Sequence, residues 1–298
     1  MCEGVLVRTS RQRLLLSTLA AAAVLLTGTA CATSATDAAI VGDVSIAEQT
    51  IFDRTSQVSG QIEQQGQQSF TVEQLAYLNR AQTTEAIRSA LLAQAAQDRG
   101  VVVTDAQVNA AMVNPTSAAT GSRPDPQVYR DQLLLEGLLS ASTGQDLSFT
   151  DRQVTIDGFL VATQADATAM KNQLESVPAG GALPAAGSSA TPLPKRTVDL
   201  LTEPASAWTD VLAAHPGETV ILTGSNGYYV VRVVDRSEAP TTVAAAKILA
   251  TQDLDSLRAF ASVALLQQYA AQVGVTVNPR MGVWDPVNLQ VVPADSSS

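Results

Sequence analysis

The sequence contains few of the residues on which most catalytic and metal sites depend. Its 298 residues include two cysteines and one histidine. Cys2 lies in a leader that we expect to be removed, which leaves Cys31 without a second thiol and excludes a structural disulfide in the mature chain. Clustered histidines and Cys-x-x-Cys pairs are absent, so the sequence predicts neither a metal site nor a cofactor.

Positive charge and long apolar runs are also scarce. The formal net charge is −10, and an acidic chain is a poor partner for nucleic acid or for an anionic membrane surface. The longest apolar run extends from Leu14 through Leu26, which is shorter than the roughly 20 residues of a spanning helix. We therefore expect no nucleic-acid partner and no membrane-spanning segment.

The N-terminus has the residue order of a secretory signal peptide. Arg8, Arg11 and Arg13 precede the apolar run, and small residues then lead to Cys31. Removal of residues 1–30 takes away these three arginines and one glutamate, which moves the formal charge from −10 to −12. We therefore expect an exported protein with a signal peptide at 1–30.

Cys31 resembles the cysteine of the bacterial lipobox, which becomes the new N-terminus and receives a lipid. Gly28 stands where that pattern usually has leucine. The resemblance implies lipidation of Cys31, with residues 31–37 as a tether to the outer face of the cytoplasmic membrane. The alternative is ordinary cleavage near Ala30, which would leave Cys31 as an exposed thiol.

Residues 38–149 read mainly as helix. A short strand and turn around Gly42-Asp43 precede expected helices near 45–65, 71–99, 104–112 and 126–139. Gly100 is placed to end the second of these. Thr104 with Gln107 forms a capping box that opens the third, and Pro126 opens the fourth.

Residues 150–236 read as a small α+β domain. The pattern predicts a strand at 154–161, a helix at 164–177, a linker or surface loop at 178–194, and a helix at 206–214. Asn226-Gly227 between two apolar runs predicts a hairpin of strands 219–223 and 228–234.

Residues 237–298 predict a long amphipathic helix and a tail. The helix should run from after Pro240 to Val273, and its apolar face needs a partner, for which the helical region before residue 145 is the nearest candidate. The tail can add a short strand. The expected fold class is mainly α with a small α+β domain, which is inserted between the helical domain and the C-terminal helix that completes it.

Four stretches carry a resemblance to the exported SurA and PrsA family of folding factors. In that family a helical chaperone domain is paired with a parvulin-type peptidyl-prolyl isomerase domain. The tail is similar to that of SurA-like lipoproteins of actinobacteria. The stretches are Ala39–Asp43 with Leu91–Gly100 and Val102–Val108, Val154–Leu174, Gly217–Glu218 with Gly227–Val233, and Val277–Trp284.

The histidine pair that the parvulin resemblance implies is missing. The first position falls in Ile156–Leu160 and the second in Gly227–Tyr229, and neither stretch contains histidine. His215 is interpreted as a solvated surface residue and Asp157 as a solvent-facing strand residue. Asp253 and Asp255 are interpreted as a solvated helix face. The sequence therefore nominates no catalytic residue.

Three hypotheses of function remain. The first is a lipid-anchored extracytoplasmic chaperone that binds unfolded or newly exported polypeptides without efficient isomerase activity. The second is an active peptidyl-prolyl isomerase of the parvulin type, in which shape and desolvation replace the histidines. The third is a structural cell-envelope lipoprotein with one dedicated partner.

Overall fold

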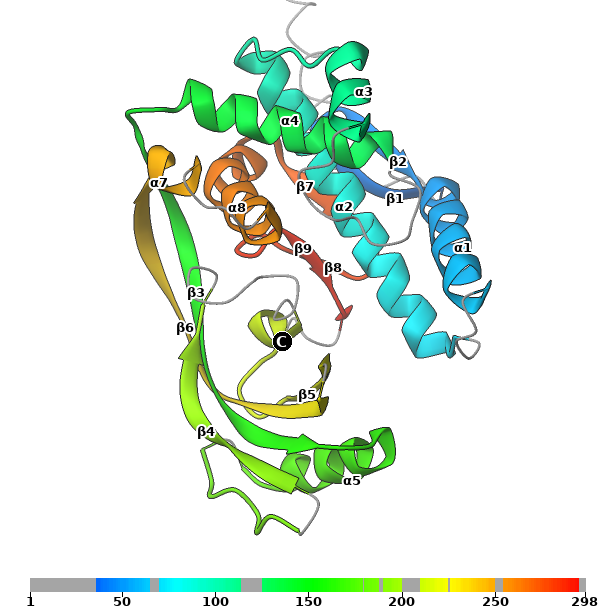
Figure 1. Ribbon diagram of the computed structural model, residues 1–298, viewed down its shortest axis with the longest axis vertical. Coiled ribbons are helices and arrows are strands. Elements are labelled where there is room, and N and C mark those ends of the chain that lie inside the picture. Colours follow the sequence, from blue (N-terminus) through cyan, green and yellow to red (C-terminus); the bar gives the residue numbers. More distant parts are fainter. Residues whose placement is uncertain are drawn as a thin grey trace, which may run out of the picture.

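A computed structural model describes residues 36–64, 70–113, 125–178, 180–187, 190–199, 210–224, 226–249 and 254–294. Within these ranges the chain is an α+β protein in which every paired strand is antiparallel. Figure 1 shows a helical body at one end and a strongly curved sheet that extends away from it. Cys31 and most of its expected tether lie outside the described residues.

The helical body is formed by α1 (Glu48–Gln64), α2 (Val72–Asp98), α3 (Asp105–Val113) and α4 (Pro126–Ala141). The helices are placed where the sequence predicts them because their starts are capped. Thr104 and Gln107 make both bonds of the predicted capping box, and Asp125 caps α4 ahead of Pro126. A second capping box, Thr71 with Gln74, opens α2.

A three-stranded sheet closes one side of this body. Its order is β2 (Val44–Ala47), β1 (Asp37–Val41) and β7 (Val275–Val277), so the tail does add a short strand. Gly42 turns the chain between β1 and β2 with φ of 56°, a left-handed conformation that glycine adopts readily.

The C-terminal helix α8 (Leu254–Val273) packs against α2 and α4, and it also contacts β3. The prediction that this helix begins just after Pro240 is wrong. Strand β6 continues to Ala244, and the short helix α7 (Ala245–Leu249) follows it. Proline and the β-branched residues at 240–243 fit this extended strand better than a helix start.

The four-stranded sheet has the order β4-β3-β6-β5. Its strands are β3 (Asp146–Val161), β4 (Ala190–Val198), β5 (Thr219–Gly224) and β6 (Gly227–Ala244). The predicted β5–β6 hairpin is confirmed, with Gly224 paired to Gly227 at its end. Helix α5 (Gln164–Glu175) packs on one face of the sheet, in contact with β3, β5 and β6.

The sheet is larger than the sequence predicts, so the expectation of a mainly α fold understates it. Strands β3 and β6 pair along their whole length, from Asp146 opposite Ala244 to Val161 opposite Tyr228. The first strand therefore begins before position 150, where the sequence places a domain boundary. The predicted linker 178–194 contains the start of β4, because Ala190 to Leu193 pair with β3.

Gly158 shows how closely the two long strands approach. A Cβ added at this position would lie 2.0 Å from the carbonyl oxygen of Val230 on β6, and its φ is 157°. A side chain at this position would push the strands apart.

None of the helices in the described part of the chain is both long and apolar enough to cross a membrane.

Candidate functional site

A cleft of about 1060 Å³ separates the lower part of α2 from the α+β part. Its first wall is α2 between Glu73 and Arg88, and its opposite wall comes from α5, β5 and the turn before β5. Residues 290–293, at and just after the last strand, line the cleft between these walls. Figure 1 shows the positions of α2, β5 and α5, which line this cleft. The cleft is therefore formed by parts of the chain that lie far apart in the sequence.

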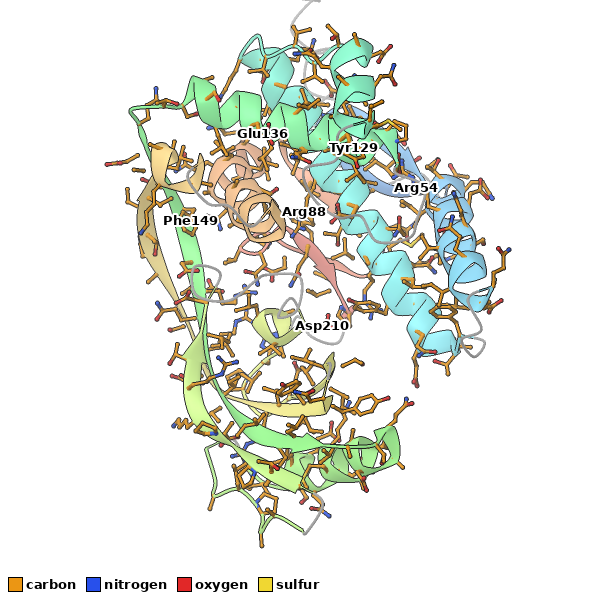
Figure 2. All side chains as sticks on the ribbon, in the orientation of Figure 1. Arg54, Arg88, Tyr129, Glu136, Phe149 and Asp210 are labelled. Carbon is orange, nitrogen blue, oxygen red and sulfur yellow. The ribbon has the colours of Figure 1, made fainter. Side chains whose placement is uncertain are left out.

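The cleft lining mixes aromatic, aliphatic and charged side chains. Tyr77 on α2 is 45% exposed. Its pKa is raised, mainly by burial and further by Asp210, while Arg80 opposes the shift. Burial also raises the pKa of Asp210, with Arg80 again acting in the opposite direction. Asp210, labelled in Figure 2, belongs to the opposite wall of the cleft. Charged groups on each wall therefore influence the pKa of a group on the other.

Strand β5 contributes a wall of the cleft and lies at one edge of its sheet. Within the part of the chain that the structure describes, it pairs with β6 alone. Thr219, Val220, Ile221 and Thr223 all line the cleft. The hydroxyl of Thr219 is buried and makes no hydrogen bond within the described part of the chain. A ligand in the cleft would therefore meet both aliphatic and hydroxyl-bearing side chains of β5.

The C-terminal hairpin of β8 (Val283–Asp285) and β9 (Gln290–Val292) connects the two walls. On the α2 side, Arg88 donates to the carbonyl of Leu289 at 2.9 Å and to the carbonyl of Asn288 at 3.0 Å. Val291 donates its N–H to the hydroxyl of Thr84 at 2.8 Å. Figure 2 shows Arg88 where α2 passes this hairpin.

On the sheet side, the hairpin is held through Arg152 of β3. The guanidinium of Arg152 is 3% exposed, and it pairs with both oxygens of Asp285. It also donates to Glu238 on β6 at 2.7 Å and to the carbonyl of Leu212 at 3.2 Å. Arg88, Arg152 and Asp285 thus fix the spacing of the two walls, and none of the three was nominated from the sequence.

The structure corrects the interpretation of Asp157. This residue is 8% exposed and forms a two-pronged ion pair with Arg232, which lies opposite it on β6 and is fully buried. Arg232 also donates to the carbonyls of Pro178 and Gly181, in the segment after α5. Asp157 is therefore a structural partner of an arginine rather than a solvent-facing residue.

The remaining sequence candidates do not gather into a site. His215 is half-buried, its backbone N–H donates to Glu218 at 2.7 Å, and its ring lies 3.5 Å from Arg236. The side chain of Asp255 and the whole of Asp253 lie outside what the structure describes. Within the described ranges, no group of three or more histidine, cysteine, aspartate or glutamate residues is placed to hold a metal ion.

A comparison with protein families finds a match for the helical body. The family model of the SurA-like N-terminal domain matches residues 6–148, which include α1 to α4 and the first residues of β3. The chain therefore contains a SurA-like N-terminal domain, and the match extends over slightly less than half of its length. The SurA-like domain therefore supplies the α2 wall of the cleft. A search of curated proteins found no match to the chain.

The cleft residues were missed because their sequence signals are weak. Tyr77 and Arg80 occupy ordinary helix positions, where either a solvated or a ligand-facing side chain is normal. One signal could have been used, which is a charge inside an apolar strand. Arg232 lies between valines in β6, and arginine is rarely buried without a carboxylate partner. Arg152 gives no such signal, because Asp151 and Gln153 flank it in β3.

Proposed function

We propose that this protein is an exported, lipid-anchored chaperone that binds unfolded or newly exported polypeptides in the cleft between α2 and the four-stranded sheet. The observation that carries the proposal is an open cleft of about 1060 Å³ with one wall made by a SurA-like domain. Its mixed apolar and polar lining suits broad, weak binding of extended chains better than recognition of one small molecule.

The chemistry of the site favours binding over catalysis. Asp157 stands in the strand where the parvulin resemblance implies a histidine, and its carboxylate is occupied by Arg232. Tyr228, in the hairpin position, lines the cleft, but its side chain is a phenol and not the imidazole that the resemblance implies. We therefore place peptidyl-prolyl isomerisation second, and a structural role with one dedicated envelope partner third.

The first experiment uses the soluble mature chain from Ala32 onward. It should delay the aggregation of guanidinium-unfolded citrate synthase at near-equal molar ratio, without accelerating a proline-limited refolding step recorded in the same sample. Uncatalysed prolyl steps take about 10–100 s, so acceleration would be visible. Acceleration would favour the isomerase. Neither effect in folded protein, together with one cross-linked envelope protein, would favour the dedicated partner.

A matched pair of variants locates the binding surface. Tyr77→Ala removes a half-exposed aromatic ring from the cleft, and we expect it to weaken the delay of aggregation about fivefold, because exposed aromatics are common binding anchors. Val113→Ala is the control, since Val113 is 77% exposed and does not line the cleft. Equal effects of the two changes would count against the cleft.

The lipid anchor is tested separately in cells. Cys31→Ala should move the full-length protein from the membrane fraction to the soluble exported fraction, because the acyl chain on Cys31 would supply the affinity for the membrane. Loss of radiolabelled palmitate from the same variant gives an independent measurement. Persistence of the variant in the membrane fraction would contradict anchoring through Cys31.

A further inference from the structure

The two edges of the four-stranded sheet differ in their protection against pairing with another strand. Edge strand β4 contains Pro192, Pro194, Lys195 and Arg196, and prolines and charges are what natural proteins place on edges to prevent such pairing. Edge strand β5 has the sequence Thr-Val-Ile-Leu-Thr-Gly, without a proline or a charge. The unprotected edge is the one that faces the cleft.

The hydrogen-bond pattern shows which backbone groups of β5 point outward. Gly224 and Gly227 are the last pair before a two-residue connection, which makes them a hydrogen-bonded pair. Such pairs alternate along antiparallel strands. The bond from the N–H of Val233 to the carbonyl of Glu218, at 2.9 Å, places Glu218 in the same alternating set. Thr219, Ile221 and Thr223 therefore direct their backbone N–H and C=O groups to the open edge.

Two further features indicate an extended backbone as the occupant of this edge. Thr219 lines the cleft and is 5% exposed. Its hydroxyl has no hydrogen-bond partner within the described chain. The wall opposite β5 is α2, which offers side chains but has its own backbone bonds satisfied inside the helix. A ligand backbone can pair with β5 while its side chains contact α2.

We propose that an extended segment of an unfolded polypeptide binds in the cleft as a fifth strand on the open edge of β5. This inference rests on the proposed chaperone function and adds the way in which clients are recognised. Backbone groups are the same in every sequence, so strand addition explains how one cleft can accept many clients. Helices, and folded proteins whose strand edges are protected or already paired, have no such backbone to offer and would be rejected.

The first test uses peptides and the unmodified mature chain. The probe is a fluorescein-labelled peptide of about eight alternating Thr and Val residues with a Lys at each end. Its two controls carry backbone N-methyl groups on every second residue, which blocks one strand edge, or on every residue, which blocks both edges. We expect the first two peptides to bind within about threefold of each other and the fully methylated one at least about tenfold more weakly. Equal binding of all three would overturn strand addition.

The second test changes the edge itself. Thr223→Pro removes one outward N–H and places on β5 the residue that protects β4, so peptide affinity should fall about tenfold. Thr223→Ala keeps the N–H and should bind like the unmodified chain. Thr223→Lys adds an edge charge, as on β4, and should also weaken binding. Circular dichroism melting of each variant verifies folding. Unchanged binding by folded Pro and Lys variants would contradict the proposal.

These results remain separable from the fate of the chaperone proposal. If the unmodified chain delays client aggregation but binds the fully methylated peptide as well as the others, the chaperone function stands and strand addition fails. If it delays no aggregation, the chaperone proposal fails on its own assay. A concentration-dependent dimer that Thr223→Pro abolishes, without peptide binding, would show that the edge pairs with a second copy and would overturn the client as its occupant.

Discussion

The helical body and the four-stranded sheet are stabilised in different ways. The body is held by aliphatic side chains, such as Leu91, Leu138 and Leu139, whose exposure is 1% or less. The sheet buries two arginines, Arg152 and Arg232, each paired with carboxylates and with backbone carbonyls. The helical body therefore depends on apolar area removed from water, whereas the sheet depends on the completeness of its buried polar networks.

This difference has a consequence for how each part responds to change. Apolar packing is graded, since a lost methyl group removes a limited area and the surroundings relax in part. A buried ion pair is closer to all-or-none, because removal of one partner leaves a charge without solvent or counter-ion. The sheet should therefore be more sensitive than the helical body to single polar substitutions.

The largest expected effect is at Arg232. Arg232→Met leaves the Asp157 carboxylate buried and unpaired and should lower the free energy of unfolding by about 4 kcal/mol. Urea unfolding followed by circular dichroism measures it. The double variant Arg232→Met with Asp157→Leu is the control and should be the more stable of the two, since no lone charge remains. A double variant less stable than the single one would contradict the claim that the sheet depends on the pairing of its buried charges.

A somewhat smaller effect is expected in the apolar body. Leu91 of α2 is fully buried, and Leu91→Ala should lower the free energy of unfolding by about 3 kcal/mol through lost transfer energy and a cavity. Hydrogen exchange should show the loss of protection in α2 and α4 before the sheet. Val102→Ala serves as control, because Val102 is 76% exposed and its change should have almost no effect. Equal destabilisation by both changes would speak against this account.

The connection between the two parts is tested at Asp285. Asp285→Asn keeps the shape of the side chain but removes the charge that faces Arg152, and should lower the free energy of unfolding by about 2 kcal/mol. Spin labels at Val72→Cys and Lys171→Cys flank the cleft, and a chain that begins at Ala32 has no other cysteine. We expect a broader label–label distance distribution in the Asn variant. An unchanged distribution would show that the hairpin does not set the cleft width.

The smallest expected effect is a pH dependence within the helical body. The pKa of Asp131 is raised to about 6, chiefly by burial, while bonds from Gln127 and Ser89 act in the other direction. Because the folded state binds this proton more tightly than the unfolded state, the stability that it adds is complete below about pH 4 and is lost as pH rises through about 6.

Asp131→Asn should therefore be more stable than the unmodified chain by about 1 kcal/mol at pH 7.5, with the difference shrinking toward pH 4.5. Asn can still accept the bonds from Gln127 and Ser89, so the two proteins differ mainly in charge. Urea unfolding at both pH values gives the measurement. A difference that stays constant with pH would assign the effect to packing rather than to titration.

Local signals in the sequence predicted many of the elements. Thr104 with Gln107, Pro126, and Asn226 with Gly227 are signals that act over a few residues. Helices α3 and α4 begin at the first two of these signals, and the β5–β6 hairpin turns at the third. The start of α8 was misplaced because a proline such as Pro240 is compatible with an edge of a strand as well as with the residues just before a helix. The extent of β3 was missed because its first residues are polar and gain their strand only by pairing with β6.

The sequence by itself determined the capped helices, the hairpin, the acidic charge and the signal-like leader, since each depends on residues within a few positions of one another. Only the tertiary structure decided where the cleft forms and which ion pairs stabilise the parts of the chain around it. Arg152 meets Asp285 across 133 residues and Arg232 meets Asp157 across 75. No local pattern encodes such a pairing, because a buried arginine can pair with any carboxylate that the folded chain brings close to it.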